Sequence, residues 1–150
     1  MTTEHSPALD CPFCAIVAGE APAREVWRDQ DVLAFLPDVP AVLGHTLVVP
    51  RAHIRDIWEL DRRTGHALAD ATRSVASAVA EVTGAEGMSL IQSNGAAAGQ
   101  SVFHLHIHVV PRRQGDRMPD VWPADADWSA DALQAVADAL RTAVHRGAPD

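Results

Sequence analysis

The sequence predicts an α+β domain built on an antiparallel sheet. Short segments rich in β-branched and apolar residues follow one another through several links of hairpin length, and the helical periodicities stand apart from them. Strands joined by such short links pair antiparallel, because a parallel pair needs a crossover of about a dozen or more residues. This grouping of strands and helices favours the α+β class over a parallel α/β fold.

Length and composition fit one globular domain. The chain has 150 residues, of which 47% are hydrophobic and 21% are charged, and a chain of this size can bury a core without disulfides. Its formal charge of -8 argues against a general affinity for nucleic acid or for anionic membranes. Because no apolar run is long enough to span a membrane and the first residues do not resemble a signal peptide, we expect a cytoplasmic protein.

The first half of the chain predicts three strands. Residues 1–10 have no apolar period and are expected to form a flexible tail. The run that begins at Cys11 is expected to turn into a short helix that ends near Gly19. Short strands are then expected where β-branched and apolar residues lie between turn residues. These strands cover residues 25–28, 32–36 and 45–50.

The next part predicts a long helix and two more strands. Asp61 is expected to cap the helix at its start and Gly84 at its end. Its apolar residues recur at spacings of three and four, which is typical of a face packed on a core. They are Leu68, Ala71, Val75, Val79 and Val82. Strands are expected at 88–92 and 102–110, with a loop of small residues at 93–101 between them.

The chain therefore divides into a domain with two flanking segments. The tail covers residues 1–10, the domain residues 11–117 and a C-terminal extension residues 118–150. An amphipathic helix over residues 129–145 is expected in the extension, where it would pack on the domain. Its apolar positions are Leu133, Val136, Leu140 and Val144.

Histidine carries the strongest chemical signal. Three of the eight histidines, His104, His106 and His108, alternate with apolar residues in one run. On a strand they would share one face, where they are costly to desolvate unless they bind one another, a ligand or a metal. The outer two Cα atoms would be about 13 Å apart, which is too far for all three to bind one ion. Either two belong to a metal site, or one acts as nucleophile or acid–base with the others in support.

The run His104-Leu-His106-Ile-His108-Val-Val resembles the signature of the histidine triad (HIT) superfamily. Two other segments are similar to those of the family: Gly44-His45-Thr-Leu-Val-Val-Pro50, its upstream strand, and the loop from Asn94 to Gly99-Gln100-Ser101-Val102 on its phosphate side. The resemblance extends over about residues 11–117, and we place the chain in the bacterial HINT/Fhit-like branch. It implies a five-stranded antiparallel sheet with one long helix, a short N-terminal helix and a C-terminal helix, and a homodimer.

The resemblance also implies a nucleotide hydrolase or nucleotidyl transferase that cleaves purine nucleoside 5′-phosphoramidates. His106 would attack the α-phosphorus and form a nucleotidyl-histidine intermediate. The other residues implied to be catalytic are His104, His108 and His45. The substrate-binding set implied, besides His106 and His108, is Asp38 for the ribose, Asn94, Gly99, Gln100 and Ser101. Asp38 lies seven residues before His45, whereas family members often have eight.

Cys11 and Cys14 form a C-x-x-C pair with three interpretations: a redox pair, inert cysteines or half of a structural zinc site. A redox pair is expected after a strand, and no strand is predicted before Cys11. Some bacterial HIT proteins resemble this chain in combining C-x-x-C with two histidines, which implies His53 and His104 as the remaining zinc ligands. Any zinc would be structural, because the covalent mechanism requires no metal.

Other functions stay open on the sequence alone. One is a dinucleoside polyphosphate (Ap3A/Ap4A) hydrolase of Fhit type, which residues 111–116 and the C-terminal helix both suggest. Another is a non-catalytic nucleotide-binding regulatory module. A metal-sequestering surface formed by the triad alone fits poorly with the apolar alternation and with the separate C-x-x-C.

Overall fold

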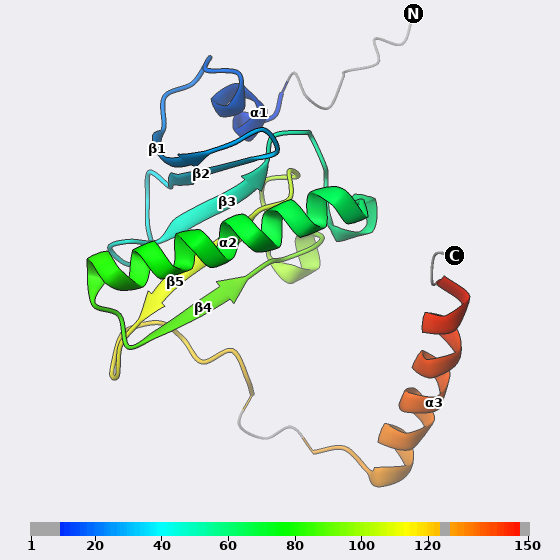
Figure 1. Ribbon diagram of the computed structural model, residues 1–150. Helices are drawn as coiled ribbons and strands as arrows, with labels where there is room; N and C mark the ends of the chain where they lie inside the picture. The colour runs from blue at the N-terminus through cyan, green and yellow to red at the C-terminus, as the bar shows by residue number, and fades with distance from the viewer. Residues whose placement is uncertain (1–9, 124–126, 148–150) are drawn as a thin grey trace, which may run out of the picture. The chain divides into compact units, whose positions relative to one another are not determined.

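The computed structural model describes residues 10–123 and 127–147, so the tail predicted at 1–10 lies outside it except for Asp10 (Figure 1). The chain forms two compact units, of which the first ends at Arg117 and the second begins at Met118. None of the helices in the described part of the chain is long and apolar enough to cross a membrane.

The described residues form three α-helices and five strands. In chain order the elements are α1 (Pro12–Val17), β1 (Arg24–Arg28), β2 (Val32–Leu36), β3 (Thr46–Pro50), α2 (Arg62–Thr83), β4 (Gly87–Ile91), β5 (Ile107–Arg112) and α3 (Ala130–Gly147), with short 3-10 helices at Ile57–Glu59 and Ala96–Ala98.

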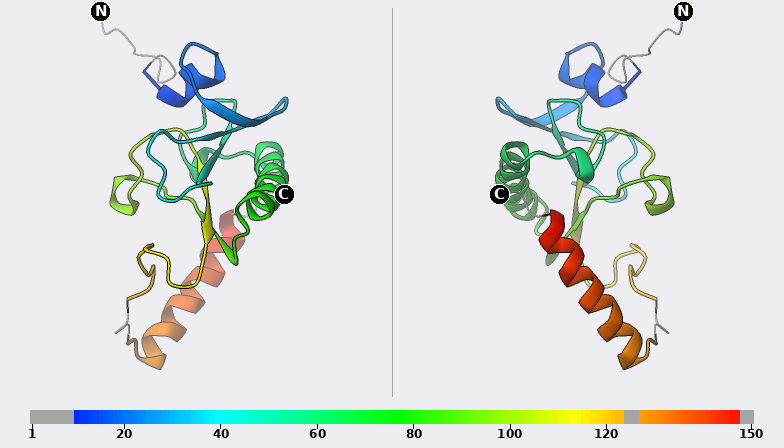
Figure 2. Two further views of the ribbon diagram at one scale, coloured as in Figure 1. Left: turned by 90° about the vertical axis from the view of Figure 1, so that its left-hand side faces the viewer. Right: turned by 90° about the vertical axis from the view of Figure 1, so that its right-hand side faces the viewer.

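The five strands form one antiparallel sheet in the order β1-β2-β3-β5-β4, which confirms the predicted α+β fold. Helix α2 lies across one face of this sheet, and the segment with the 3-10 helix Ala96–Ala98 lies on the other side (Figures 1 and 2). β5 pairs with β3 on one side and with β4 on the other. β5, which contains the last histidine of the run, is therefore an interior strand of the sheet.

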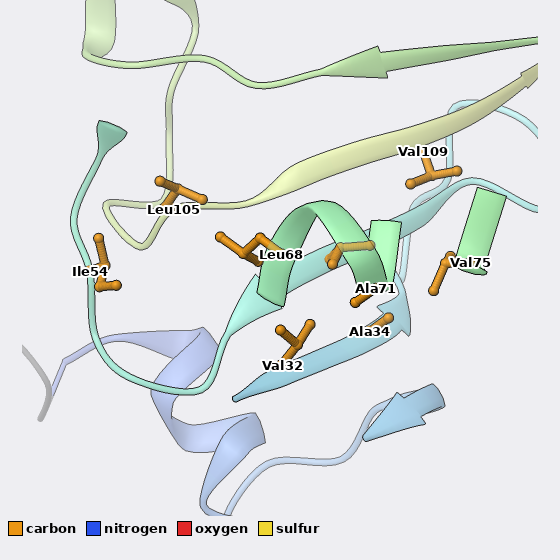
Figure 3. Close-up of a cluster of buried hydrophobic side chains, with 9 residues drawn as sticks. Val32, Ala34, Ile54, Leu68, Ala71, Val75, Leu105 and Val109 are labelled. Carbon is orange, nitrogen blue, oxygen red and sulfur yellow. The ribbon is translucent and has the colours of Figure 1, made fainter. Parts of the chain in front are cut away.

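The sheet buries apolar side chains on both faces. One cluster lies between α2 and the sheet (Figure 3) and consists of Val32, Ala34, Val48, Ile54, Leu68, Ala71, Val75, Leu105 and Val109. A second cluster includes α1 and consists of Cys11, Phe13, Leu33, Phe35, Leu47 and Val49. Alternate residues of β2 and β3 enter different clusters because successive side chains of a strand point to opposite faces. This explains why these strands are almost continuously apolar.

Helix α2 begins and ends where the sequence predicts. The carboxylate of Asp61 accepts the backbone N–H of Thr64 at 2.9 Å and its hydroxyl at 2.7 Å, which caps the first turn. Gly84 ends the helix with φ 65°, in the left-handed region that glycine adopts without steric cost. The C-terminal helix is confirmed as well, at Ala130–Gly147.

The strand predicted at 102–110 is wrong at its start. β5 begins only at Ile107, so that His104 and His106 precede the strand and the three histidines do not share one strand face. The reason is a change of hydrogen-bond partner. The backbone N–H of Leu105 donates to the carbonyl of Ile54 at 2.7 Å, outside the ladder with β3.

The prediction that the apolar residues of α2 face the core is also wrong for the last of them, Val82. Leu68, Ala71 and Val75 are buried, and Val79 is packed at the edge of the cluster. Val82 is 86% exposed because the last turn of α2 extends past the apolar cluster.

We expect Leu68→Ala to lower the free energy of unfolding by about 2–5 kcal/mol, because it leaves a cavity between α2 and the sheet. Val39→Ala, at an exposed loop position, should change it by less than about 0.5 kcal/mol. Urea unfolding followed by circular dichroism measures both. Equal losses in the two variants would contradict the assignment of Leu68 to the core.

Candidate functional site

Three histidines meet at the paired strands β3 and β5. His45 immediately precedes β3, His106 immediately precedes β5, and His108 lies on β5 opposite Leu47. The ring centroids of His45 and His108 are 5.1 Å apart, and those of His106 and His108 are 4.9 Å apart. His45 and His106 are buried. The sheet pairing thus brings together residues that are about sixty positions apart in the sequence.

Hydrogen bonds to the backbone assign the tautomers of His45 and His108. The backbone N–H of Ala41 lies 3.0 Å from Nδ1 of His45, and an amide can only donate, so this Nδ1 carries the lone pair. The proton of neutral His45 is therefore on Nε2, which donates to Nδ1 of His108 at 2.9 Å. It follows that neutral His108 carries its own proton on Nε2.

The same reasoning assigns the tautomer of His106. Its Nδ1 lies 2.8 Å from the carbonyl oxygen of His104, and a carbonyl can only accept, so Nδ1 carries the proton. The lone pair of the neutral ring is then on Nε2. The ring of Phe13 packs against His106 edge to face, with centroids 5.2 Å apart. A hydrogen bond and an aromatic contact together fix the orientation of this imidazole.

Burial favours the neutral forms on which these assignments depend. It lowers the pKa of His108 to about 4, with smaller contributions from the charges of His106 and His45. Burial also lowers the pKa of His45. Both rings are therefore neutral at pH 7 and able to donate one hydrogen bond and accept another.

The loop before the triad is held by the side chain of Gln100. Its Oε1 accepts the backbone N–H of Gly95 at 2.8 Å, and its Nε2 donates to the carbonyls of Arg55 and Val102 at 2.9 and 3.1 Å. Gln100 thus connects both ends of the loop to the segment after β3. The family resemblance implies that this residue binds phosphate, and in this conformation its side-chain amide holds the loop in place.

The other predicted substrate residues differ in their surroundings. The side-chain amide of Asn94 pairs with that of Gln92 at 2.7 and 2.8 Å and accepts the N–H of Ile57 at 2.8 Å. Gly99 has φ 91°, which allows the loop to turn before Ser101, and Ser101 is exposed. These positions place backbone amides and a hydroxyl next to the histidine run.

Asp38 lies apart from this network among the described contacts. Its side chain is 95% exposed and forms an ion pair with the exposed Arg24, with 3.8 Å between Oδ1 and Nη1. A surface pair of this kind contributes little to stability. Among the described contacts this weak surface ion pair is the one that holds the carboxylate, and its predicted ribose contact stays a prediction.

A second cluster brings two thiols and two imidazoles together. One nitrogen or sulfur atom from each of Cys11, Cys14, His53 and His104 lies within 4.8 Å of the others. Nδ1 of His53 is 3.2 Å from Sγ of Cys14, and Nδ1 of His104 is 3.4 Å from Sγ of Cys11 and 3.5 Å from Sγ of Cys14. The C-x-x-C pair sits at the start of α1, whose first residue is Pro12.

The donor set fits a tetrahedral zinc ion. Zn–S bonds of about 2.3 Å and Zn–N bonds of about 2.0–2.1 Å imply ligand separations of roughly 3.3–3.8 Å, close to those found here. Nε2 of His104 lies 2.8 Å from the carbonyl of Pro50, so Nε2 carries the proton and Nδ1 has its lone pair toward the thiols.

The redox interpretation of the cysteines is not supported by the pKa of Cys14. Burial is the main cause that raises this pKa to about 11. A raised pKa is the opposite of what a reactive redox thiol needs, which speaks against the redox interpretation.

His104 connects the two clusters. Its ring belongs to the cysteine cluster, while its backbone carbonyl binds Nδ1 of His106. Sequence reasoning identified the histidines but missed this carbonyl, the amide of Ala41 and the ring of Phe13. The only signal for any of them is that Phe13 lies between the two cysteines, since a backbone group leaves no trace in residue identity.

Comparisons with known proteins find a matching family model and similar solved structures. A family model described as HIT domain matches residues 18–115. A solved structure of a HIT family member from Bacillus subtilis is 35% identical, with a TM-score of 0.84, and the match covers 94% of this chain and 99% of that chain.

Two other similar proteins have descriptions that mention a metal or an enzymatic activity. A solved structure described as a Zn-bound histidine triad family protein from Mycobacterium smegmatis is 37% identical, with a TM-score of 0.71, over 91% of this chain and 99% of that chain. A protein of Arabidopsis thaliana named adenylylsulfatase HINT3 is 36% identical over 107 residues, which is 71% of this chain and 54% of that protein.

The lowered pKa of His108 predicts a specific pH dependence of stability. The unfolded imidazole, with its ordinary pKa of 6.5, binds a proton at a pH where the folded one does not. Acidification from pH 6.5 to about 4 therefore favours unfolding, by less than about 1.4 kcal/mol per pH unit for one half-buried group.

Urea unfolding at several pH values between 7.5 and 4 tests this expectation. The variant His108→Asn keeps a hydrogen-bond acceptor but cannot titrate, so its free energy of unfolding should fall less steeply below pH 6.5. Parallel curves for the wild type and the variant would contradict the expected contribution of His108.

Proposed function

The chain belongs to the HIT domain family, and on that premise we propose that it is a nucleotide hydrolase that cleaves purine nucleoside 5′-phosphoramidates through a nucleotidyl-histidine intermediate. The observation that carries the proposal is the orientation of His106. Its Nδ1–H is held on the carbonyl of His104 at 2.8 Å, which leaves the lone pair of Nε2 for attack on phosphorus.

The first chemical step forms a bond between Nε2 of His106 and the α-phosphorus while the bond from phosphorus to the leaving nitrogen breaks. The leaving nitrogen takes up one proton from solvent and departs as the amine, and the water of the second step returns one proton to solvent. The phosphorylated ring keeps its Nδ1–H and is positively charged, and the carbonyl dipole of His104 stabilises this charge.

In the second step a water molecule attacks the same phosphorus and breaks its bond to Nε2. The water gives up a proton, so one water is consumed over the two steps and the nucleoside monophosphate leaves. His106 returns to its neutral form with the proton still on Nδ1.

His45 and His108 support this reaction by holding each other in one tautomer. Because Nδ1 of His108 accepts from His45 at 2.9 Å, the Nε2–H of His108 is available to the phosphate or to the leaving group. The loop braced by Gln100 supplies backbone amides and the hydroxyl of Ser101 beside the same region. In a protein of charge -8, such local donors are the physical source of affinity for an anion.

The predicted substrate contacts of Asn94, Gly99, Gln100 and Ser101 stay part of this proposal, as does the ribose contact of Asp38. The exposed carboxylate of Asp38 is accessible to a ligand, because its ion pair with Arg24 is itself at the surface. The expected homodimer and the cytoplasmic location also stay predictions.

We propose zinc as a structural ion held by Cys11, Cys14, His53 and His104. The support is the donor geometry of this cluster together with the Zn-bound relative. When bound, the ion supplies a rigid tetrahedral link and neutralises the two thiolates. The residues themselves tie α1 to the end of β3 and fix the backbone at His104.

The dinucleoside polyphosphate alternative is less favoured by the structure. Residues 111–116 and the C-terminal helix suggested it, and arginines that were free could bind the additional phosphates of such a substrate. Arg112 instead forms a two-bond ion pair with Asp116, at 2.7 and 2.9 Å, and Arg113 donates to the carbonyl of Thr83. These arginines are engaged in holding the turn after β5.

We expect His106→Ala to lower the rate of AMP release from adenosine 5′-phosphoramidate by roughly 10⁴-fold or more, because the nucleophile is lost. His66→Ala, at an exposed position of α2, serves as the matched control and should keep wild-type activity. Diadenosine tetraphosphate and adenylyl sulfate, assayed in parallel, identify the preferred leaving group. A wild-type protein that binds AMP but turns over none of the three compounds would replace the enzyme proposal with the regulatory module.

We expect one zinc ion per chain by elemental analysis of the purified protein. Cys14→Ser and His53→Asn should each reduce zinc content and lower the melting temperature, whereas His66→Ala should change neither. Several ions per chain would instead favour metal sequestration, and a zinc-free protein with an unchanged melting temperature after chelation would refute the structural ion.

A further inference from the structure

The Asn94-Gly95 peptide has a chemistry of its own, separate from that of the histidines. Asn94 is the one asparagine in the 150 residues, and a glycine follows it directly. The backbone nitrogen of the next residue can attack the side-chain carbonyl of an asparagine, and glycine permits this most readily because it has no side chain to obstruct the approach. This reaction, deamidation, is one reason why asparagine is a thermolabile residue.

Deamidation needs only the chain and water. The nitrogen of Gly95 loses its proton and bonds to Cγ of Asn94. The bond from Cγ to Nδ2 then breaks, and the side-chain nitrogen leaves as ammonia with the proton that Gly95 gave up. Water opens the resulting five-membered succinimide at either carbonyl carbon, which leaves an aspartate or an isoaspartate. One water is consumed and one ammonia is released, without an oxidant, a reductant or a cofactor.

The folded chain holds the nitrogen that this reaction needs. The backbone N–H of Gly95 donates to Oε1 of Gln100 at 2.8 Å. The side chain of Gln100 is itself fixed, because the residue is only 4% exposed and its Nε2 donates to the carbonyls of Arg55 and Val102 at 2.9 and 3.1 Å. The oxygen therefore cannot turn away from Gly95 without breaking two further hydrogen bonds in a buried place.

Loss of the Gly95 proton is unfavourable in this position. A deprotonated nitrogen would face the lone pairs of the Gln100 oxygen at hydrogen-bond distance. Like charges repel more strongly where burial excludes water, so the amide keeps its proton. The carbonyl of Gly95 is held as well, since it accepts the backbone N–H groups of Ala98 and Gln100, both at 3.1 Å.

The side chain of Asn94 is held in place but is not made less reactive. Its Oδ1 accepts the backbone N–H of Ile57 and Nε2 of Gln92, both at 2.8 Å. Donors on a carbonyl oxygen stabilise the negative charge that develops there during attack, so these two bonds favour the reaction at Cγ. Suppression must therefore act on the nucleophile, and the group that holds the nucleophile is Gln100.

We propose that Asn94-Gly95 is the intrinsic deamidation site of this chain and that Gln100 suppresses the reaction by holding the N–H of Gly95. This role is distinct from the phosphate contact that the family resemblance implies for the same residue. A carboxylate at position 94 could not donate to Oε1 of Gln92, as Nδ2 of Asn94 does at 2.7 Å, and would loosen the loop. The effect on substrate contacts in this loop rests on the proposed function.

Mass spectrometry of the full-length protein, aged at mildly alkaline pH, tests the proposal. Exchange of the amide for a carboxyl group changes the mass of the peptide that contains residue 94. Gln100→Leu offers no acceptor oxygen and should deamidate at least tenfold faster than the wild type. Gln100→Glu loses the same two donated bonds but keeps an oxygen for Gly95, so it should deamidate at least tenfold more slowly than Gln100→Leu. Gln114→Ala, at an exposed position, is the control and should match the wild type.

Hydrogen exchange, followed by NMR, reads the removal of the same proton directly. The amide of Gly95 should exchange at least tenfold faster in Gln100→Leu than in the other proteins, whereas that of Val109 in β5 should exchange equally in all of them.

Equal deamidation rates in Gln100→Leu and Gln100→Glu would overturn the proposal, because these variants differ in the acceptor. Loss of Val109 protection in Gln100→Leu would attribute its deamidation to unfolding and overturn it too, as would a wild type that deamidates as fast when folded as in urea. Neither readout involves turnover, so a failure of the proposed catalytic function is distinguishable from a failure of this proposal.

Discussion

The hydrogen bond from Nδ1–H of His106 to the carbonyl of His104 is the constraint on which the rest of the site depends. It fixes at once the tautomer and the direction of the imidazole that we propose as nucleophile. The carbonyl can do so only if residue 104 itself is immobile. Its ring is fully buried, donates to the carbonyl of Pro50 and faces the thiols of Cys11 and Cys14.

The sheet explains why these groups meet. β5 is paired on both sides, so a residue on it is held by two ladders, and the antiparallel register with β3 brings His45 to His108. Apolar clusters on both faces exclude water from the same strands, and burial lowers the pKa values of His45 and His108, which keeps these two imidazoles neutral. Packing, strand pairing and protonation state are therefore consequences of one arrangement, in which the histidine cluster lies on the paired interior strands β3 and β5.

Most of the fold could be predicted because its determinants are local. These determinants are the β-branched runs, the aspartate before α2 and the glycine after it, each of which acts within a few residues. They predicted the positions of the strands along the chain and the ends of α2 nearly as observed. The start of β5 could not be predicted, because Leu105 exchanges a strand partner for the carbonyl of Ile54, and alternation of residue types is the same in either case. The exposure of Val82 could not be predicted, because it depends on where the apolar core ends. The contacts of the Ala41 amide and the His104 carbonyl could not be predicted either, because backbone groups do not differ between residue types.

The use of a backbone carbonyl has a consequence for how the site can change in evolution. Any amino acid at position 104 offers the same acceptor, so the orientation of His106 is not tied to the imidazole that precedes it by two residues. The ring of residue 104 contacts the cysteine cluster, the carbonyl of Pro50 and the ring of Phe13. Descendants could therefore exchange the four residues of the cysteine cluster for apolar packing, a change that is tolerable wherever new contacts hold the backbone equally still, and keep the same orientation of His106. The imidazole of His106 and the donor set of the cysteine cluster would then diverge independently, although both depend on residue 104.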